Sequence, residues 1–143
     1  MTLLRLAGAL SAGVALLHIA ILLLGAPAYR YFGAGERMAR LAERGAPGPA
    51  VITLGLILMF AIWAAYAFSG AGLIGPLPYL RRVLLAIGAV YTLRGLVLGP
   101  QLVWFLSGHR DAVPERYLLF SAVSLLIGLA YLLGTSSRFF QSR

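Results

Sequence analysis

The chain contains no cysteine and no lysine, and it has few carboxylates. All 12 of its basic residues are arginine, against 4 acidic residues in 143. The absence of cysteine excludes disulfides, thiolate catalysis and thiolate metal ligands, and with them quinone-coupled disulfide membrane enzymes. Only 11% of the residues are charged, whereas a soluble domain carries about 25%. The chain is therefore not an ordinary soluble domain.

Apolar residues make up 61% of the chain and lie in runs of about twenty. Such a run spans a hydrocarbon layer of about 30 Å as a helix at about 1.5 Å per residue. We therefore predict an all-α integral membrane protein, a four-transmembrane-helix bundle that forms a single domain over residues 1–143. The predicted spans cover about residues 2–24, 50–68, 79–106 and 117–134.

The first apolar run ends in a small-residue stretch of the kind that signal peptidase cleaves, but Pro27 lies inside it. We therefore expect this run to be a retained transmembrane helix.

A polar stretch separates the first and second spans. Within it we predict a short amphipathic interfacial helix over residues 34–44, lying on the membrane surface. Glu36 and Arg40 are spaced to pair on one face of this helix, and Gly45 and Pro47 end it.

The third predicted span is long for one crossing and contains Pro100. A proline removes one backbone donor and crowds the carbonyl four residues earlier. We therefore expect a tilt or a kink between Leu96 and Pro100. The segment before this span, residues 69–78, is rich in glycine and proline and predicts a tight connection between the second and third spans.

Four spans place both termini on one side of the membrane. Five arginines then lie on the terminal side and six on the other, so the positive-inside rule does not decide the orientation. Arginines stand immediately before the first and third spans, at Arg5, Arg81 and Arg82. On that basis we expect a multi-pass protein of the bacterial inner membrane with cytoplasmic termini.

Arg94 lies about twelve residues into the third span, far from either end. A charge near the bilayer centre costs at least ~2.5–3.5 kcal/mol, and arginine does not deprotonate to avoid that cost. Tyr91 and Gln101 lie on the same helix face. An adjacent face carries a stripe of small residues that favours close helix packing. This stripe comprises Gly88, Thr92, Gly95 and Gly99.

Polar residues at a similar depth in other spans supply neighbours for Arg94. Counting rise from the terminal side brings these residues within a turn or two of one another, so a shared interior cluster is predicted. The alternative is structural, because membrane Ser, Thr and His commonly bond their own or a neighbouring helix. The predicted ligand-binding residues are Arg94, His18, Tyr91, Gln101, Ser121 and Ser124.

Other arginines lie outside the apolar runs. We expect Arg37, Arg40, Arg44, Arg81 and Arg82 to contact anionic lipid headgroups or a partner protein. No basic patch is interleaved with aromatic residues, so nucleic acid is not an expected partner.

No catalytic residue, cofactor or metal is predicted. No Asp or Glu lies within any predicted span, which argues against proton-coupled four-helix drug exporters and sterol-isomerase-like proteins. His18 and His109 are a poor pair for a bis-His haem, because His109 lies in a loop. His18 also lacks a nearby carboxylate for a Ser-His-Asp triad.

The segment ERMAR at residues 36–40, in a four-helix chain of this length, resembles the start of the E-R-x-x-R motif of the MAPEG family of membrane glutathione-handling enzymes. The resemblance implies a trimer that binds glutathione through Arg37 and Arg40. The family motif continues with an Asn and a further Glu, where this chain has Arg44 and Pro47.

A histidine late in the first span (Leu17-His18), followed by Phe32-Gly33 and an alanine-rich helix, is similar to small bacterial four-helix membrane proteins of the domain-of-unknown-function type. That resemblance implies no particular activity.

Three functions follow from these features. The first is binding or transport of an anionic or carbonyl-bearing amphiphile, of the lipid or quinone class, at Arg94. The second is a structural or accessory subunit of a membrane complex, in which Arg94 bonds only carbonyls. The third is a MAPEG-like glutathione-dependent membrane enzyme. Expected partners are membrane lipids, a small amphiphilic ligand, and further copies of the chain or a larger membrane complex.

Overall fold

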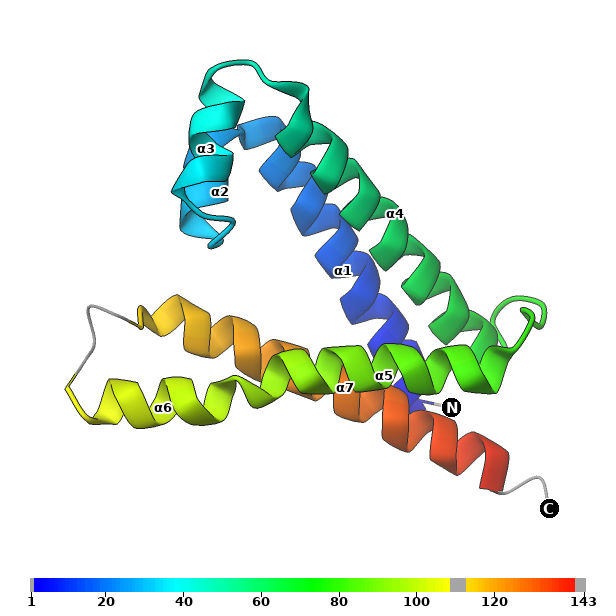
Figure 1. The fold of residues 1–143 in the computed structure, drawn as a ribbon. Helices are drawn as coiled ribbons and strands as arrows, with labels where there is room; N and C mark the ends of the chain where they lie inside the picture. Colours follow the sequence, from blue (N-terminus) through cyan, green and yellow to red (C-terminus); the bar gives the residue numbers. More distant parts are fainter. Residues whose placement is uncertain (1, 109–112, 141–143) are drawn as a thin grey trace. The chain divides into compact units, whose positions relative to one another are not determined.

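The computed structural model describes residues 2–108 and 113–140, and over these residues it is helical with no strand. Four helical spans are long and apolar enough to cross a membrane. Both findings confirm the predicted all-α fold with four candidate transmembrane helices (Figure 1). The helices are α1 (Thr2–Leu24), α2 (Ala26–Tyr31), α3 (Glu36–Glu43), α4 (Pro47–Gly70), α5 (Leu80–Leu96), α6 (Leu98–Leu106) and α7 (Glu115–Phe140).

Two of the long helices extend beyond their predicted ends. Helix α4 begins at Pro47 rather than at residue 50, because proline is well tolerated in the first turn, where its missing N–H has no partner to lose. Helix α7 continues to Phe140 rather than ending at residue 134. The hydroxyls of Ser136 and Ser137 each donate to the carbonyl four residues earlier, so these polar residues are accommodated within the helix.

The third span is interrupted at Val97, between the end of α5 and the start of α6. Pro100 has no N–H to donate to the carbonyl of Leu96, four residues earlier, and its ring crowds that carbonyl. The interruption therefore falls within the segment between Leu96 and Pro100, where a distortion was predicted. Beyond it, α6 buries none of its residues.

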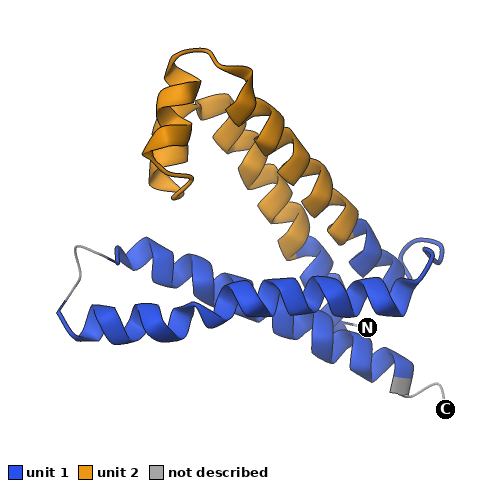
Figure 2. Cartoon of the chain, viewed as in Figure 1, with its two compact units in different colours: residues 1–9, 65–143 blue, residues 10–64 orange. Residues whose placement is uncertain are grey.

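The chain forms two compact units, which Figure 2 shows in different colours. Unit 1 comprises residues 1–9 and 65–143, and unit 2 comprises residues 10–64. The expectation of a single membrane domain stays a prediction.

In unit 1, helices α5 and α7 approach closely through glycines. A methyl group on Gly95 would lie 2.5 Å from the backbone nitrogen and Cα of Leu125, and one on Gly88 would lie 2.8 Å from Leu132. A methyl group on Gly128 of α7 would likewise lie 2.5 Å from the backbone nitrogen of Thr92. Three members of the small-residue stripe therefore lie against α7.

The fourth member of that stripe behaves differently. No other atom lies within 4 Å of where a methyl group on Gly99 would be. This difference agrees with the position of Gly99 in α6, beyond the interruption of the helix.

Unit 2 contains the polar connection between α1 and α4. Gly25, with φ of 69°, ends α1, and Pro27 in the first turn begins the separate helix α2. Helix α3 places Met38 and Ala39 against Tyr29 of α2. Its apolar face therefore packs within unit 2. A short helix between the first and second spans is thus present, as predicted, and its position on the membrane surface stays a prediction.

Candidate functional site

Arg94 belongs to unit 1 and contacts two of the residues predicted to accompany it. Its Nη1 donates a hydrogen bond of 3.0 Å to the Ser121 hydroxyl of α7. The Ser121 hydroxyl in turn donates to the Gln101 side-chain oxygen of α6, at 2.7 Å. We call these three residues the arginine site.

The backbone of Arg94 lies away from both ends of its span. Arg94 is near the middle of the span Leu80–Leu106. Ser121, which it bonds, is six residues after the start of α7 at Glu115, or roughly 9 Å into that helix at 1.5 Å per residue. The long side chain therefore carries its charge from mid-span toward the α6–α7 end.

Within the residues that the structure describes, Arg94 forms no ion pair with a carboxylate. Glu36, Glu43 and Glu115 are the carboxylates within the described residues, and none of them forms an ion pair with Arg94. The side chain of Arg94 is exposed, although Ser121 beside it is fully buried. A guanidinium has five N–H donors, so this group can donate to a further acceptor.

Two other predicted ligand-binding residues of unit 1 have contacts within the protein, and their role in ligand binding stays a prediction. Tyr91 is buried and its ring stacks on Tyr131, with centroids 5.9 Å apart and planes 17° apart. The Ser124 hydroxyl donates to the carbonyl of Phe120 in its own helix.

His18 lies in unit 2. Its Nδ1 is 2.8 Å from the carbonyl oxygen of Val14 in the same helix, and its ring packs against Phe60, with centroids 4.9 Å apart. The prediction that His18 shares a cluster with Arg94 stays a prediction. His109 and Asp111 lie outside the described residues.

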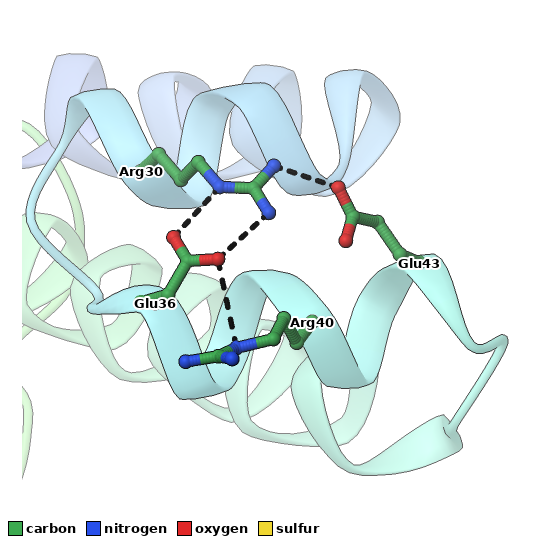
Figure 3. Close-up of polar contacts among 4 residues, drawn as sticks. All are labelled: Arg30, Glu36, Arg40 and Glu43. Atoms are coloured by element: carbon green, nitrogen blue, oxygen red, sulfur yellow. Dashed lines mark hydrogen bonds and ion pairs between the residues drawn. The ribbon is translucent and has the colours of Figure 1, made fainter.

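Helices α2 and α3 are joined by ion pairs on Arg30, drawn in Figure 3. Its Nε and Nη2 donate to both oxygens of Glu36, at 2.8 and 3.0 Å, and its Nη1 donates to Glu43 at 2.7 Å. Arg40 pairs with Glu36 at 3.6 Å, at the predicted i,i+4 spacing. The hydrogen bonds from Arg30 lower the pKa of both carboxyls and raise the pKa of the guanidinium.

The outer face of α3 is strongly basic. Arg37, Arg40 and Arg44 line a cavity of about 430 Å³ together with Leu41. These four residues recur at helical spacing and share one face of the helix. Arg40 pairs with Glu36, which Arg30 also binds, so the three arginines outnumber the carboxylates and positive charge predominates on this face.

The remaining arginines predicted at the interface lie at the start of α5 and are exposed. The guanidinium of Arg81 lies 5.9 Å from the ring centroid of Phe139, within range of a cation–π contact. Arg82 follows Arg81 directly in the sequence and is also exposed.

The sequence did not predict the contact between Arg138 and Ser69. Arg138 donates to the backbone carbonyl of Ser69 at 3.0 Å, near the end of α4. The Ser69 hydroxyl donates to the Gly75 carbonyl at 2.8 Å and accepts from the Leu77 amide at 3.0 Å, which holds the connection before α5. A serine at the end of an apolar run, before a glycine- and proline-rich turn, is the available signal for such a contact.

Sequence reasoning also did not identify Tyr29 and Thr53, which bond each other at 2.9 Å in unit 2 and are both buried. A threonine within an apolar helix signals a hydrogen bond but does not indicate its partner. The ion pairs of Arg30 form because the turn between α2 and α3 brings the two helices side by side. Helical spacing within one helix therefore does not predict them.

Comparisons with known proteins find no match for this chain, among family models, curated proteins or solved structures. The resemblances to the MAPEG family and to the small bacterial four-helix proteins therefore stay predictions.

Proposed function

We propose that this chain binds or transports an anionic or carbonyl-bearing amphiphile, of the lipid or quinone class, at the arginine site. The observation that carries the proposal is the partner of Arg94. A permanent cation in an apolar span is bonded to a neutral hydroxyl, with no ion pair to a described carboxylate. Ionisable groups within membrane helices are expensive and therefore mark functional sites.

The chemistry of the site defines the ligand. Arginine offers only donors, so the ligand supplies an acceptor, either a carboxylate, a phosphate or a carbonyl. Gln101 and Ser121 orient the guanidinium through the bonded chain from Nη1 to the Gln101 oxygen. Exposed apolar side chains near Arg94, including Leu93 and Val97, suit the hydrocarbon part of the same ligand.

We also propose that the protein resides in the bacterial inner membrane and functions as a homo-oligomer or within a larger membrane complex. The four apolar spans support a multi-pass arrangement. The exposed Leu16, Leu58 and Leu126 on three of them supply surface for lipid or for another membrane helix.

The test measures retention of two amphiphiles by native mass spectrometry. Purified full-length protein is loaded with dodecanoate, which supplies an anion, or with a decyl-substituted benzoquinone, which supplies carbonyls. We expect Arg94→Leu to reduce retention of at least one probe by ten- to a hundredfold, because a charge-assisted hydrogen bond contributes about 1.5–3 kcal/mol. Arg82→Leu, which removes an exposed arginine at the start of the same span, is the matched control and should retain the benzoquinone like the wild type.

Equal retention by the Arg94→Leu and wild-type proteins overturns the proposal. Equal retention together with a higher thermal midpoint of Arg94→Leu supports the accessory-subunit alternative. In that case Arg94 destabilises the fold and binds no ligand.

A further inference from the structure

Unit 2 contains a small cavity that is separate from the arginine site. It has a volume of about 220 Å³, close to that of seven water molecules at about 30 Å³ each. A group the size of one substituted benzene ring fills such a volume. Its apolar wall is formed by Ile21, Phe32, Met38 and Leu56.

Three polar side chains also line this cavity: His18, Tyr29 and Thr53. The Thr53 hydroxyl lies 2.8 Å from the Pro49 carbonyl oxygen, which can only accept, so the threonine proton is donated there. Tyr29 lies 2.9 Å from the same hydroxyl and must therefore donate to it. Both hydroxyl protons are used within the protein, and what remains on the Tyr29 oxygen is a lone pair.

His18 also lines the cavity and carries a second acceptor. Its Nδ1 lies 2.8 Å from the carbonyl oxygen of Val14. A carbonyl only accepts, so Nδ1 carries the proton, and Nε2 of the neutral ring then carries a lone pair. The packing of the ring against Phe60, at 4.9 Å between centroids, holds this orientation.

We infer that this cavity binds an apolar molecule bearing a hydroxyl group, a phenol or an alcohol, that donates to His18 Nε2. The polar groups of the cavity are acceptors, so a hydroxyl finds a partner while a carbonyl or carboxylate faces only lone pairs. An acceptor left without a donor loses a hydrogen bond, so the cavity favours a ligand that donates over an acceptor-only ligand. The arginine site has the opposite preference, and the present inference does not depend on it.

The test uses three fluorinated probes of similar size with full-length protein in lipid nanodiscs. 4-Fluorophenol has a donor, 4-fluorotoluene has no polar group, and 4-fluorobenzaldehyde has only an acceptor. Fluorine NMR measures the Kd of each, corrected with empty nanodiscs for partition into lipid. We expect the phenol to bind about five- to tenfold more tightly than the other two, the net effect of one hydrogen bond.

Three variants locate the binding. His18→Phe keeps an aromatic ring but removes the acceptor, and it should abolish the preference for phenol. Leu56→Trp fills the cavity and should remove binding of all three probes. Leu58→Trp places the same indole on an exposed position of α4 and should bind like the wild type.

Three results overturn the inference. The first is equal affinity of the wild type for the three probes, and the second is unchanged phenol binding by Leu56→Trp. The third is an unchanged preference for the phenol in a folded His18→Phe protein. If His18→Phe does not fold, the pair of tryptophan variants still decides the location, and the three probes on the wild type decide the chemistry.

Discussion

Arg30 and Arg94 carry the same guanidinium group in different surroundings. Arg30 donates to two carboxylates and joins α2 to α3. Arg94 donates to a serine hydroxyl within an apolar span. The first arrangement satisfies the charge within the protein. The second leaves donors for an external acceptor, which is why the proposed function rests on Arg94.

The Arg30 ion pairs predict a pH dependence of stability. Hydrogen bonds from Arg30 hold the pKa of Glu36 and of Glu43 below the ordinary value in the folded state. Their contribution is therefore present above the unfolded pKa of about 4.3 and is lost as pH falls through the lowered folded pKa. We expect the thermal midpoint of the purified protein to fall between pH 5 and pH 3, measured by circular dichroism.

Two arginine variants separate the contribution of Glu36 and Glu43 to this pH dependence from that of the other carboxylates. Arg30→Gln should lower the midpoint at pH 6 and reduce the further fall toward pH 3. Arg37→Gln, on the basic face of α3, should follow the wild-type profile. The prediction is wrong if Arg30→Gln and wild type lose stability in parallel, because these exposed pairs then contribute nothing measurable.

Residue spacing predicted part of the arginine site. The prediction that Gln101 and Ser121 lie near Arg94 used helix periodicity and depth alone, and these residues are bonded in the structure. The same reasoning did not distinguish Ser124, which bonds its own helix. Helical periodicity identifies a shared face, but which of two hydroxyls one turn apart faces the partner depends on how the helices are rotated.

At the scale of helices, the close approach of α5 to α7 depends on the absence of side chains. A Cβ at Gly95 would meet the backbone of Leu125 at 2.5 Å, and a backbone cannot rotate away as a side chain can. We expect Gly95→Ala to destabilise the protein by about 1–3 kcal/mol or more, because helix α7 must shift. Unfolding in a denaturing detergent, followed by circular dichroism, measures the change.

Gly99→Ala is the matched control for this prediction. It makes the same substitution in the same stripe, where no other atom lies within 4 Å of the added methyl group. Alanine is the better helix former by up to about 1 kcal/mol, so we expect no loss of stability. Equal destabilisation of the two variants would show that the stripe does not set the spacing of α5 and α7.

The apolar runs predicted the long helices, because each run is long enough to span a membrane and is ended by polar or turn-forming residues. The interruption at Val97 was also predictable, since Pro100 lacks one donor. Helix α2 was not predicted. It is six residues long, which is too short for a helical periodicity to appear in the sequence. It packs against α3, and such contacts between helices are not visible in the sequence.

At the scale of the whole molecule, four spans that each cross the membrane place the termini on the same side. We predict that this side is cytoplasmic. A fluorescent protein that matures only in the cytoplasm, fused after Arg143, should fluoresce. Alkaline phosphatase, which is active only outside the cytoplasm, should be active when inserted within residues 37–44. The reverse pattern of the two reporters would invert the orientation.

Units 1 and 2 contain binding features of opposite polarity. Unit 1 presents the donors of Arg94, and the cavity of unit 2 is lined by His18, Tyr29 and Thr53, whose free positions are acceptors. No pattern in the sequence predicted this division, because it depends on which proton each hydroxyl and ring nitrogen donates inside the protein.

Helix α6 buries none of its residues, and this makes it a suitable attachment point for a spectroscopic label. The side chain of Val103 is exposed, and the chain has no cysteine, so a thiol introduced there would be the sole target for a maleimide spin probe. Electron paramagnetic resonance with lipid-soluble oxygen and a water-soluble nickel chelate as relaxation agents would then report how deeply this helix is immersed.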